Sequence, residues 1–154
     1  MVNILDGYNV TVCAPTPFTG ATNGRGDKDT IGDEFPLFYT RGEVKVIVYG
    51  VCTTTLVGAG AISVGVAGNT ALILPSIADA TTIAANDVWV DASVAEVRGF
   101  VATSLPAATY LTNSSTILEA VVTTDVTAGN IYYVCLWIPI TPDAYVKASV
   151  PRDY

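Results

Sequence analysis

The sequence predicts an all-β fold, a β-sandwich or jelly roll with an extended N-terminal arm. Residues 41–91 are rich in Val, Ile, Thr, Tyr and Gly, and glycine interrupts them about every eight to ten residues. Short strands separated by glycine turns at this spacing are typical of sandwiches and jelly rolls. No segment carries an apolar stripe at helical spacing, so we expect under about one tenth of the residues to be helical.

The chain divides by composition into an arm, residues 1–36, and a sandwich domain, residues 37–154. Turn-forming residues dominate the arm, and its prolines at 15, 17 and 36 lack the N–H that a central strand position needs. We therefore expect an arm that docks onto a neighbour. The competing interpretation is that it completes the subunit's own sheet, which Tyr8 to Val12 could do locally. Isolated apolar side chains predict the candidate contacts with a neighbouring subunit or surface: Phe18, Phe35, Leu37 and Phe38.

The first half of the sandwich domain predicts three strands. Residues 43–56 form a long strand in which Val44, Val46 and Val48 share one face, with Lys45, Ile47 and Tyr49 on the other. Residues 61–67 form the return strand, with Gly65 as a bulge or close-approach site. A Gly68-Asn69 turn leads into residues 70–74, and Pro75 is expected to end that strand.

The second half predicts four more strands. One short helical turn is expected within residues 76–87, before a strand at 88–90. Residues 96–103 read as a further strand. Residues 116–124 and 130–140 form the last pair, joined by residues 125–129.

Composition excludes several classes of partner. The chain of 154 residues is 51% hydrophobic and only 14% charged, yet no apolar run approaches the ~18–20 residues of a membrane-spanning helix. We therefore expect no membrane partner, and subunit contacts, most plausibly in a homotrimer, to use the excess apolar surface. The net charge is −7 and the seven basic residues are scattered, which argues against a nucleic-acid partner.

The residues that usually carry catalysis are missing or lack a recognisable context. The sequence has no histidine, which removes Ser-His-Asp and Cys-His catalysis and the commonest zinc ligand. We expect no enzymatic activity, no cofactor and no metal site. The acidic segment 27–34 resembles a calcium loop but has Ile31 and Phe38 at ligand positions, so we interpret it as a solvated loop. Arg25-Gly26-Asp27 is an RGD tripeptide that chance explains.

The cysteines and the strand aromatics are predicted to be structural. Cys13, Cys52 and Cys135 are widely spaced in apolar contexts, so we expect buried free thiols. Aromatic residues on strands can bind sugars but are more often core or subunit-interface anchors. That is our interpretation of Trp89, Trp137, Tyr132 and Tyr133.

Residues 37–140 resemble a group of small structural proteins of tailed-phage virions. In that group a strand ending in a glycine-Val-x-Thr-Thr turn precedes a Val-Gly-Val-Ala-Gly strand and an aromatic-Asp-Ala turn. The matching segments here are GEVKV (42–46), GVCTT (50–54), ISVGVAGNTALI (62–73), DVWVDA (87–92) and GNIYYVCLW (129–137). The resemblance implies a virion structural role, most plausibly capsid decoration or cement, and implies no catalytic residue.

These observations predict a decoration protein that binds the major capsid protein and stabilises the head. It would be made in the bacterial host cytoplasm, since the N-terminus lacks a secretory signal. Its acidity would be repelled by packaged DNA, so we expect it on the outer capsid surface. The alternatives are a head-fibre or receptor-binding module that contacts host glycans, and a cellular surface or pilus-like subunit. Aromatics buried at subunit contacts would favour cement, and aromatics in a shallow outer groove would favour a glycan binder.

Overall fold

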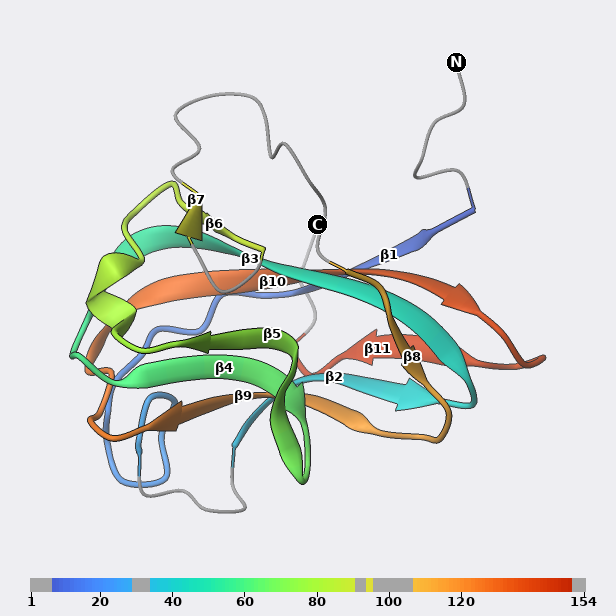
Figure 1. Cartoon of the computed structure of the whole chain (residues 1–154), viewed down its shortest axis with the longest axis horizontal. Helices are drawn as coiled ribbons and strands as arrows, with labels where there is room; N and C mark the ends of the chain where they lie inside the picture. Colours follow the sequence, from blue (N-terminus) through green and yellow to red (C-terminus); the bar gives the residue numbers. More distant parts are fainter. Residues whose placement is uncertain (1–6, 29–33, 91–93, 96–106, 151–154) are drawn as a thin grey trace.

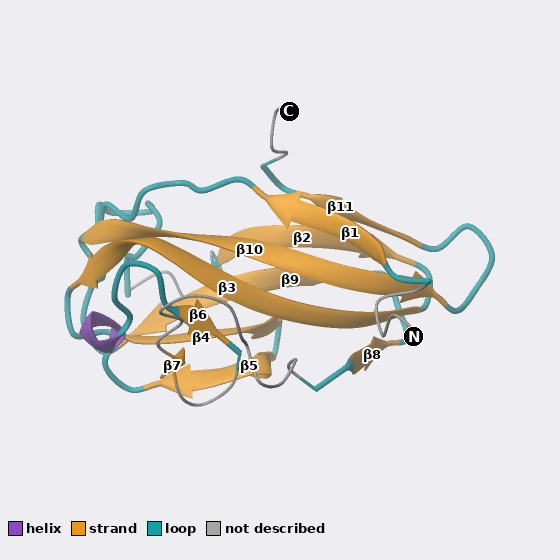
Figure 2. Ribbon diagram, turned by 90° about the horizontal axis from the view of Figure 1, so that it is seen from above, coloured by secondary structure: helices purple, strands orange, loops and turns teal. Residues whose placement is uncertain are grey.

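The computed structural model is a sandwich of two antiparallel β-sheets (Figures 1 and 2). It describes residues 7–28, 34–90, 94–95 and 107–150. Within these residues the helical structure is a single 3-10 turn, η1 (Ala80–Thr82), as the sequence predicts. The all-β prediction is therefore confirmed, with the sandwich as its architecture.

Sheet A is built around the two longest strands, whereas the strands of sheet B are shorter. Sheet A contains, in spatial order, β1 (Asn9–Cys13), β10 (Ala128–Pro139), β3 (Val44–Val57), β6 (Val88–Trp89) and β7 (Val94–Ala95), with β8 (Thr109–Leu111) also paired to β3. Sheet B contains β11 (Tyr145–Ala148), β2 (Phe35–Arg41), β9 (Thr116–Val122), β4 (Ala61–Val66) and β5 (Asn69–Ile77). The two sheets are joined along one side, where Thr11 Oγ1 of β1 donates to the Val146 carbonyl of β11 at 3.3 Å.

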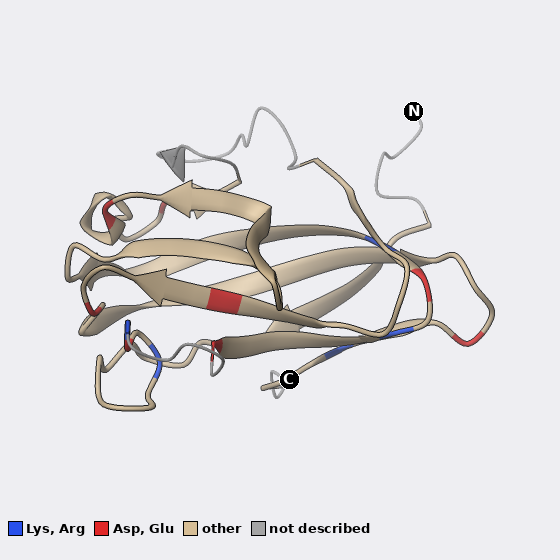
Figure 3. Ribbon diagram, turned by 60° about the horizontal axis from the view of Figure 1, so that its bottom comes forward, with Lys and Arg blue, Asp and Glu red and all other residues tan. Residues whose placement is uncertain are grey.

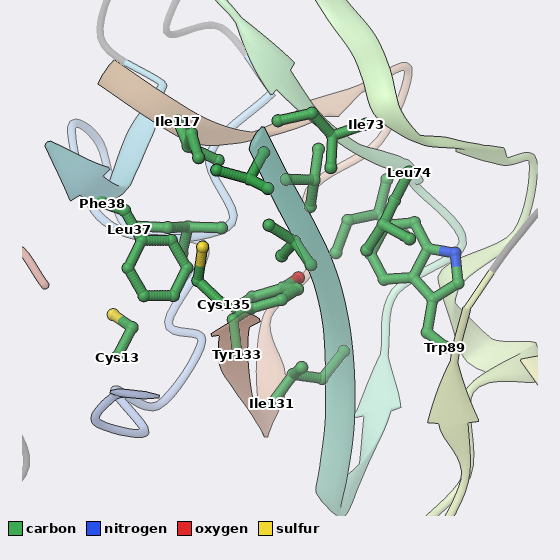
Figure 4. Close-up of a cluster of buried hydrophobic side chains, with 14 of the residues drawn as sticks. Cys13, Leu37, Phe38, Ile73, Leu74, Trp89, Ile117, Ile131, Tyr133 and Cys135 are labelled. Carbon is green, nitrogen blue, oxygen red and sulfur yellow. The ribbon is translucent and has the colours of Figure 1, made fainter. Parts of the chain in front are cut away.

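Alternation along the two longest strands positions the core. In β3, Val44, Val46 and Val48 are fully buried between the sheets, as the pattern predicts. On β10, Tyr133 also points into this core. Its ring packs beside that of Trp89, with the ring centroids 6.3 Å apart (Figure 4). The side chains that alternate with these along β3 and β10 point to the outer surface of sheet A.

Gly65 marks a close approach between two strands, as expected. A Cβ atom at this position would lie 2.2 Å from the carbonyl oxygen of Asn69, so no side chain fits where β5 passes β4. The pairing of β4 and β5 shifts register on both sides of Val64. Pro75 does not end β5, which continues to Ile77. Because β5 is the outer strand of sheet B, no neighbouring strand needs an N–H from Pro75.

Four strands were not predicted, β2, β11 and the short strands β7 and β8, and one predicted strand lies outside the described residues. Strand β2 escapes the pattern because a register shift between Pro36 and Phe38 buries two consecutive side chains, Leu37 and Phe38. Strand β11 has only four residues, too few for alternation to identify. The expected strand at residues 96–103 lies entirely in the part of the chain that the structure does not describe.

The described part of residues 1–36 belongs to the sandwich, which corrects the expected docking arm. Strand β1 pairs in register with β10, from Asn9 opposite Trp137 to Cys13 opposite Tyr133. Phe18 is 3% exposed inside the core, and its N–H donates to the Gly129 carbonyl at 3.0 Å. Pro15 and Pro17 lie outside the strands, as argued, but Pro36 pairs with Leu118 within β2, and the prolines do not keep neighbouring side chains out of the core.

We expect Phe18→Ala to lower the free energy of unfolding by about 3–5 kcal/mol, because it opens a cavity at a buried aromatic site. Removal of residues 1–34 is expected to leave an unfolded or aggregated chain, because β1 and Phe18 are lost together. Urea denaturation followed by far-UV dichroism measures both. Val10→Ala is the control, since Val10 is 62% exposed on β1. A truncated chain with native stability would contradict the assignment of the N-terminal segment to the sandwich core.

Candidate functional site

A buried ion pair joins the N-terminal segment to both sheets. The Arg25 guanidinium donates from Nε to Glu119 Oε1 at 2.8 Å and from Nη2 to Oε2 at 2.6 Å. Glu119 lies on β9 of sheet B, and Tyr133 on β10 of sheet A donates its hydroxyl to the same carboxylate at 2.6 Å. Both members of the pair are almost completely shielded from water.

The remaining hydrogen-bonding capacity of Arg25 is satisfied as well. Its Nη1 donates to the carbonyl oxygens of Thr16 and Ile131, the latter at 3.1 Å. The guanidinium also stacks over the Phe18 ring, 4.1 Å from the centroid. Burial alone would lower the pKa of Arg25, but the Glu119 carboxylate outweighs it and raises that pKa. Burial, reinforced by Glu119, also raises the pKa of Tyr133 well above its usual value.

We interpret this network as structural, because the Glu119 carboxylate already accepts three hydrogen bonds and its side chain is only 1% exposed, although it borders a cavity of about 130 Å³ beside Asn23, Phe35 and Val121. The network also changes the interpretation of the RGD tripeptide. Arg25 is 5% and Asp27 8% exposed, so the tripeptide is not displayed on the surface. Between them, Gly26 has φ +95°, and a Cβ there would lie 2.0 Å from the Val126 carbonyl oxygen. One signal in the sequence could have revealed the network. Glu119 is an acidic residue at an inward-facing position of β9, between the apolar residues Ile117 and Val121.

The four predicted contact residues do not form an accessible site. Phe18, Leu37 and Phe38 lie in the core of their own subunit, with exposed fractions of 3%, 0% and 0%. Phe35 is half-buried against the same core, and its ring lies 5.0 Å from the Arg25 guanidinium. Insertion into a neighbour would require removing these side chains from the core. The candidate contacts are therefore corrected to core residues.

The cysteines are buried free thiols, as predicted. Burial raises the pKa of Cys52 to about 11 and raises that of Cys135 further. A thiol nucleophile requires the thiolate, which burial disfavours at both positions.

The strand aromatics fall into two groups. Trp89 and Tyr133 are core residues, in agreement with the interpretation from sequence. Trp137 is half-buried and donates from Nε1 to Thr11 Oγ1 at 3.0 Å, which fastens β1 to β10. Tyr132 is half-buried on the outer side of sheet A.

The acidic segment 27–34 lies mostly outside the described residues. Asp27 Oδ2 accepts the Asn23 N–H at 2.8 Å, so this carboxylate closes its own loop. Over the part of the chain that the structure describes, no three Asp, Glu, Cys or His side chains gather as a metal site would require.

The outer face of sheet A is apolar and aromatic. Three side chains on it, Ile47, Val134 and Leu136, are largely buried although no second layer of described strands covers them. Half-buried neighbours pack against them, namely Tyr8, Val12, Tyr49, Ala108 and Tyr132. The described part of this face also includes Val10, Lys45, Val51, Tyr110 and Ile138. Among the residues of this face that the structure describes, the charged one is Lys45, whose ammonium lies 5.8 Å from the ring centroids of both Tyr8 and Tyr110.

Two members of this face project into solvent. Val10 and Tyr110 are each 62% exposed, the highest values among the large apolar side chains described. Burial and the neighbouring Tyr132 raise the pKa of Tyr49, consistent with a partly desolvated surface. A sheet face of this composition is suited to burial against another protein.

The outer face of sheet B differs in chemistry. Strands β11 and β2 place Tyr145 opposite Arg41 and Lys147 opposite Tyr39. Tyr39 and Tyr145 are 44% and 43% exposed. Beside them a shallow groove of about 230 Å³ is lined by Tyr39, Thr40, Ser114, Ser115 and Thr116. Hydroxyl groups, two cations and two tyrosines thus lie on one surface.

Comparisons of the chain with models of protein families, with curated proteins and with solved structures find no match. Within the described residues, no helix has the length and apolar character needed to cross a bilayer.

We expect Glu119→Gln to lower the free energy of unfolding by about 3–5 kcal/mol, since the buried Arg25 charge would lose its counter-charge. The double variant Arg25→Met/Glu119→Leu should regain much of this loss, because neither charge then remains buried. Chemical denaturation measures both effects. Asp143→Asn, in an exposed turn, is the control and should change stability by under about 0.5 kcal/mol. A single variant as stable as the control would contradict the role given to the pair.

Proposed function

We propose that the chain is a structural virion protein that decorates the outer surface of a phage head. The main support for this proposal is the apolar and aromatic outer face of sheet A, on which Val10 and Tyr110 are the most exposed residues. In this proposal that face docks on the major capsid protein. The resemblance of residues 37–140 to tailed-phage structural proteins supports the same assignment.

The distribution of charge supports placement on the outside of the shell. The net charge is −7, and acidic residues of the described chain lie in turns at the ends of the sandwich, as well as in the buried pair (Figure 3). Packaged DNA would repel such a subunit from the inner surface. The charged side chain that the described part of the docking face carries is a cation, Lys45.

A subunit docked in this way would act mechanically. A stable interface buries more than about 1,000 Å² of surface in total. If that area spans a seam between capsomers, opening the seam must also expose the docking face to water. The free energy of this exposure adds to the resistance of the shell.

We expect the double variant Val10→Asp/Tyr110→Asp to bind heads at least tenfold more weakly, because it places carboxylates in an apolar interface. The assay is cosedimentation with heads assembled without the chain, together with the temperature at which those heads release DNA. Val122→Asp is the matched control, since Val122 is 50% exposed on sheet B. Wild-type chain that fails to cosediment, or equal binding by both variants, would refute docking through sheet A.

We also propose that the subunit self-associates as a homotrimer, because 51% of its residues are hydrophobic and only 14% are charged. Sedimentation equilibrium at micromolar concentration should give three times the chain mass of 16.0 kDa. A single species at the chain mass, both free and after release from heads, would rule the trimer out.

The second candidate function is a head-fibre or receptor-binding module that contacts host glycans. Tyr39 and Tyr145 on the outer face of sheet B favour it, because exposed tyrosines beside a hydroxyl-lined groove can stack on sugar rings. The two candidates use opposite faces of the sandwich, so one subunit can combine both activities.

A further inference from the structure

Strand register places six polar and aromatic side chains in two rows on the outer face of sheet B. Lys147, Tyr39 and Thr116 form one row across β11, β2 and β9. Tyr145 and Arg41 form the next row. Ser114 extends this row, because its Oγ accepts the N–H of Gly42, the residue after Arg41, at 3.3 Å.

The size of this array suits a short oligosaccharide. Neighbouring strands lie about 4.8 Å apart, and residues two apart on one strand about 6.7 Å apart. The array therefore covers about 10 Å by 7 Å, enough for two or three sugar rings. Two hydrogen bonds fix the chain beneath this array. The Thr40 N–H donates to the Ser115 carbonyl at 2.8 Å, and the Ser115 N–H donates to Thr40 Oγ1 at 3.0 Å.

The chemistry of the array favours a sugar that carries carboxylates. Tyrosine rings offer stacking surfaces, and the hydroxyls of Ser114 and Thr116 can donate or accept hydrogen bonds. Arg41 and Lys147 supply two exposed positive charges in a chain of net charge −7. An Arg guanidinium matches a carboxylate in shape and charge.

Other partner classes fit less well. Nucleic-acid binding needs a longer series of cations along the phosphate backbone than Arg41 and Lys147 provide. The two rows include no aliphatic side chain, whereas the centre of a protein interface is usually apolar. Asp143 belongs to the turn before β11 and lies outside both rows.

We propose that the outer face of sheet B binds an acidic oligosaccharide, with its carboxylates on Arg41 and Lys147 and its rings on Tyr39 and Tyr145. This inference deepens the second candidate function by naming the site and the class of sugar. It is independent of docking through sheet A, which uses none of these residues.

The test is an amide-resolved NMR titration of the full chain with a trisaccharide of galacturonic acid. We expect saturable shifts confined to β2, β11 and residues 112–116. The methyl-esterified trisaccharide is the matched neutral probe and should bind at least tenfold more weakly. The double variant Arg41→Gln/Lys147→Gln should weaken binding of the free acid by about tenfold or more, as expected for lost charge-assisted hydrogen bonds.

Matched controls lie on the opposite face. Lys45→Gln removes a half-buried cation and Tyr110→Ala an exposed tyrosine, and both should bind the free acid within about twofold of wild type. Tyr39→Ala should weaken binding where Tyr110→Ala does not. Dichroism of every variant establishes that it is folded.

Three outcomes would overturn the inference. Equal binding of acid and ester would exclude the acidic class while leaving a glycan function at this face. Saturable shifts on sheet A alone would exclude the site. Absence of saturable shifts with either probe would exclude both the inference and the second candidate function, whereas head docking is measured separately by cosedimentation.

Discussion

The sandwich depends on a buried ion pair between the Arg25 guanidinium and the Glu119 carboxylate. Arg25 is surrounded by aromatic rings and lies within hydrogen-bonding distance of Glu119, Thr16 and Ile131. A guanidinium in such surroundings is tolerated only when a carboxylate accompanies it and its remaining donors find acceptors. Those requirements fix the path of the N-terminal segment between the sheets. They also fix the conformation at Gly26 and the position of Phe18.

Sequence alone predicted best the long strands, in which apolar residues alternate over several consecutive positions. In β3 the residues Val44, Val46 and Val48, and in β10 the residues 131, 133 and 135, are apolar and buried, so these strands and their faces follow from the pattern. In β2 a register shift buries Leu37 and Phe38 side by side, which removes the alternation. Without β2 and β11, the outward residues Tyr39 and Tyr145 could not be assigned to a common surface.

The N-terminal segment shows what composition does not reveal. Its prolines and glycines correctly indicated irregular backbone, but burial depends on partners distant in the sequence. Phe18 is buried because Arg25 stacks on it, and Arg25 is buried because Glu119, 94 residues away, neutralises it. No local pattern contains that pairing. The inward acid at Glu119 was the available signal, and its meaning required knowledge of which cation approaches it.

The joining of β1 to β10 has a consequence for the order of events in folding. Asn9 to Cys13 pair with residues 133–137, so the first described strand finds its partner only when most of the chain exists. The Arg25 pair likewise waits for β9 and β10. Contacts between segments so far apart must be made after a large loss of chain entropy, which slows folding. During synthesis the nascent chain therefore cannot complete its core until its last strands have left the ribosome.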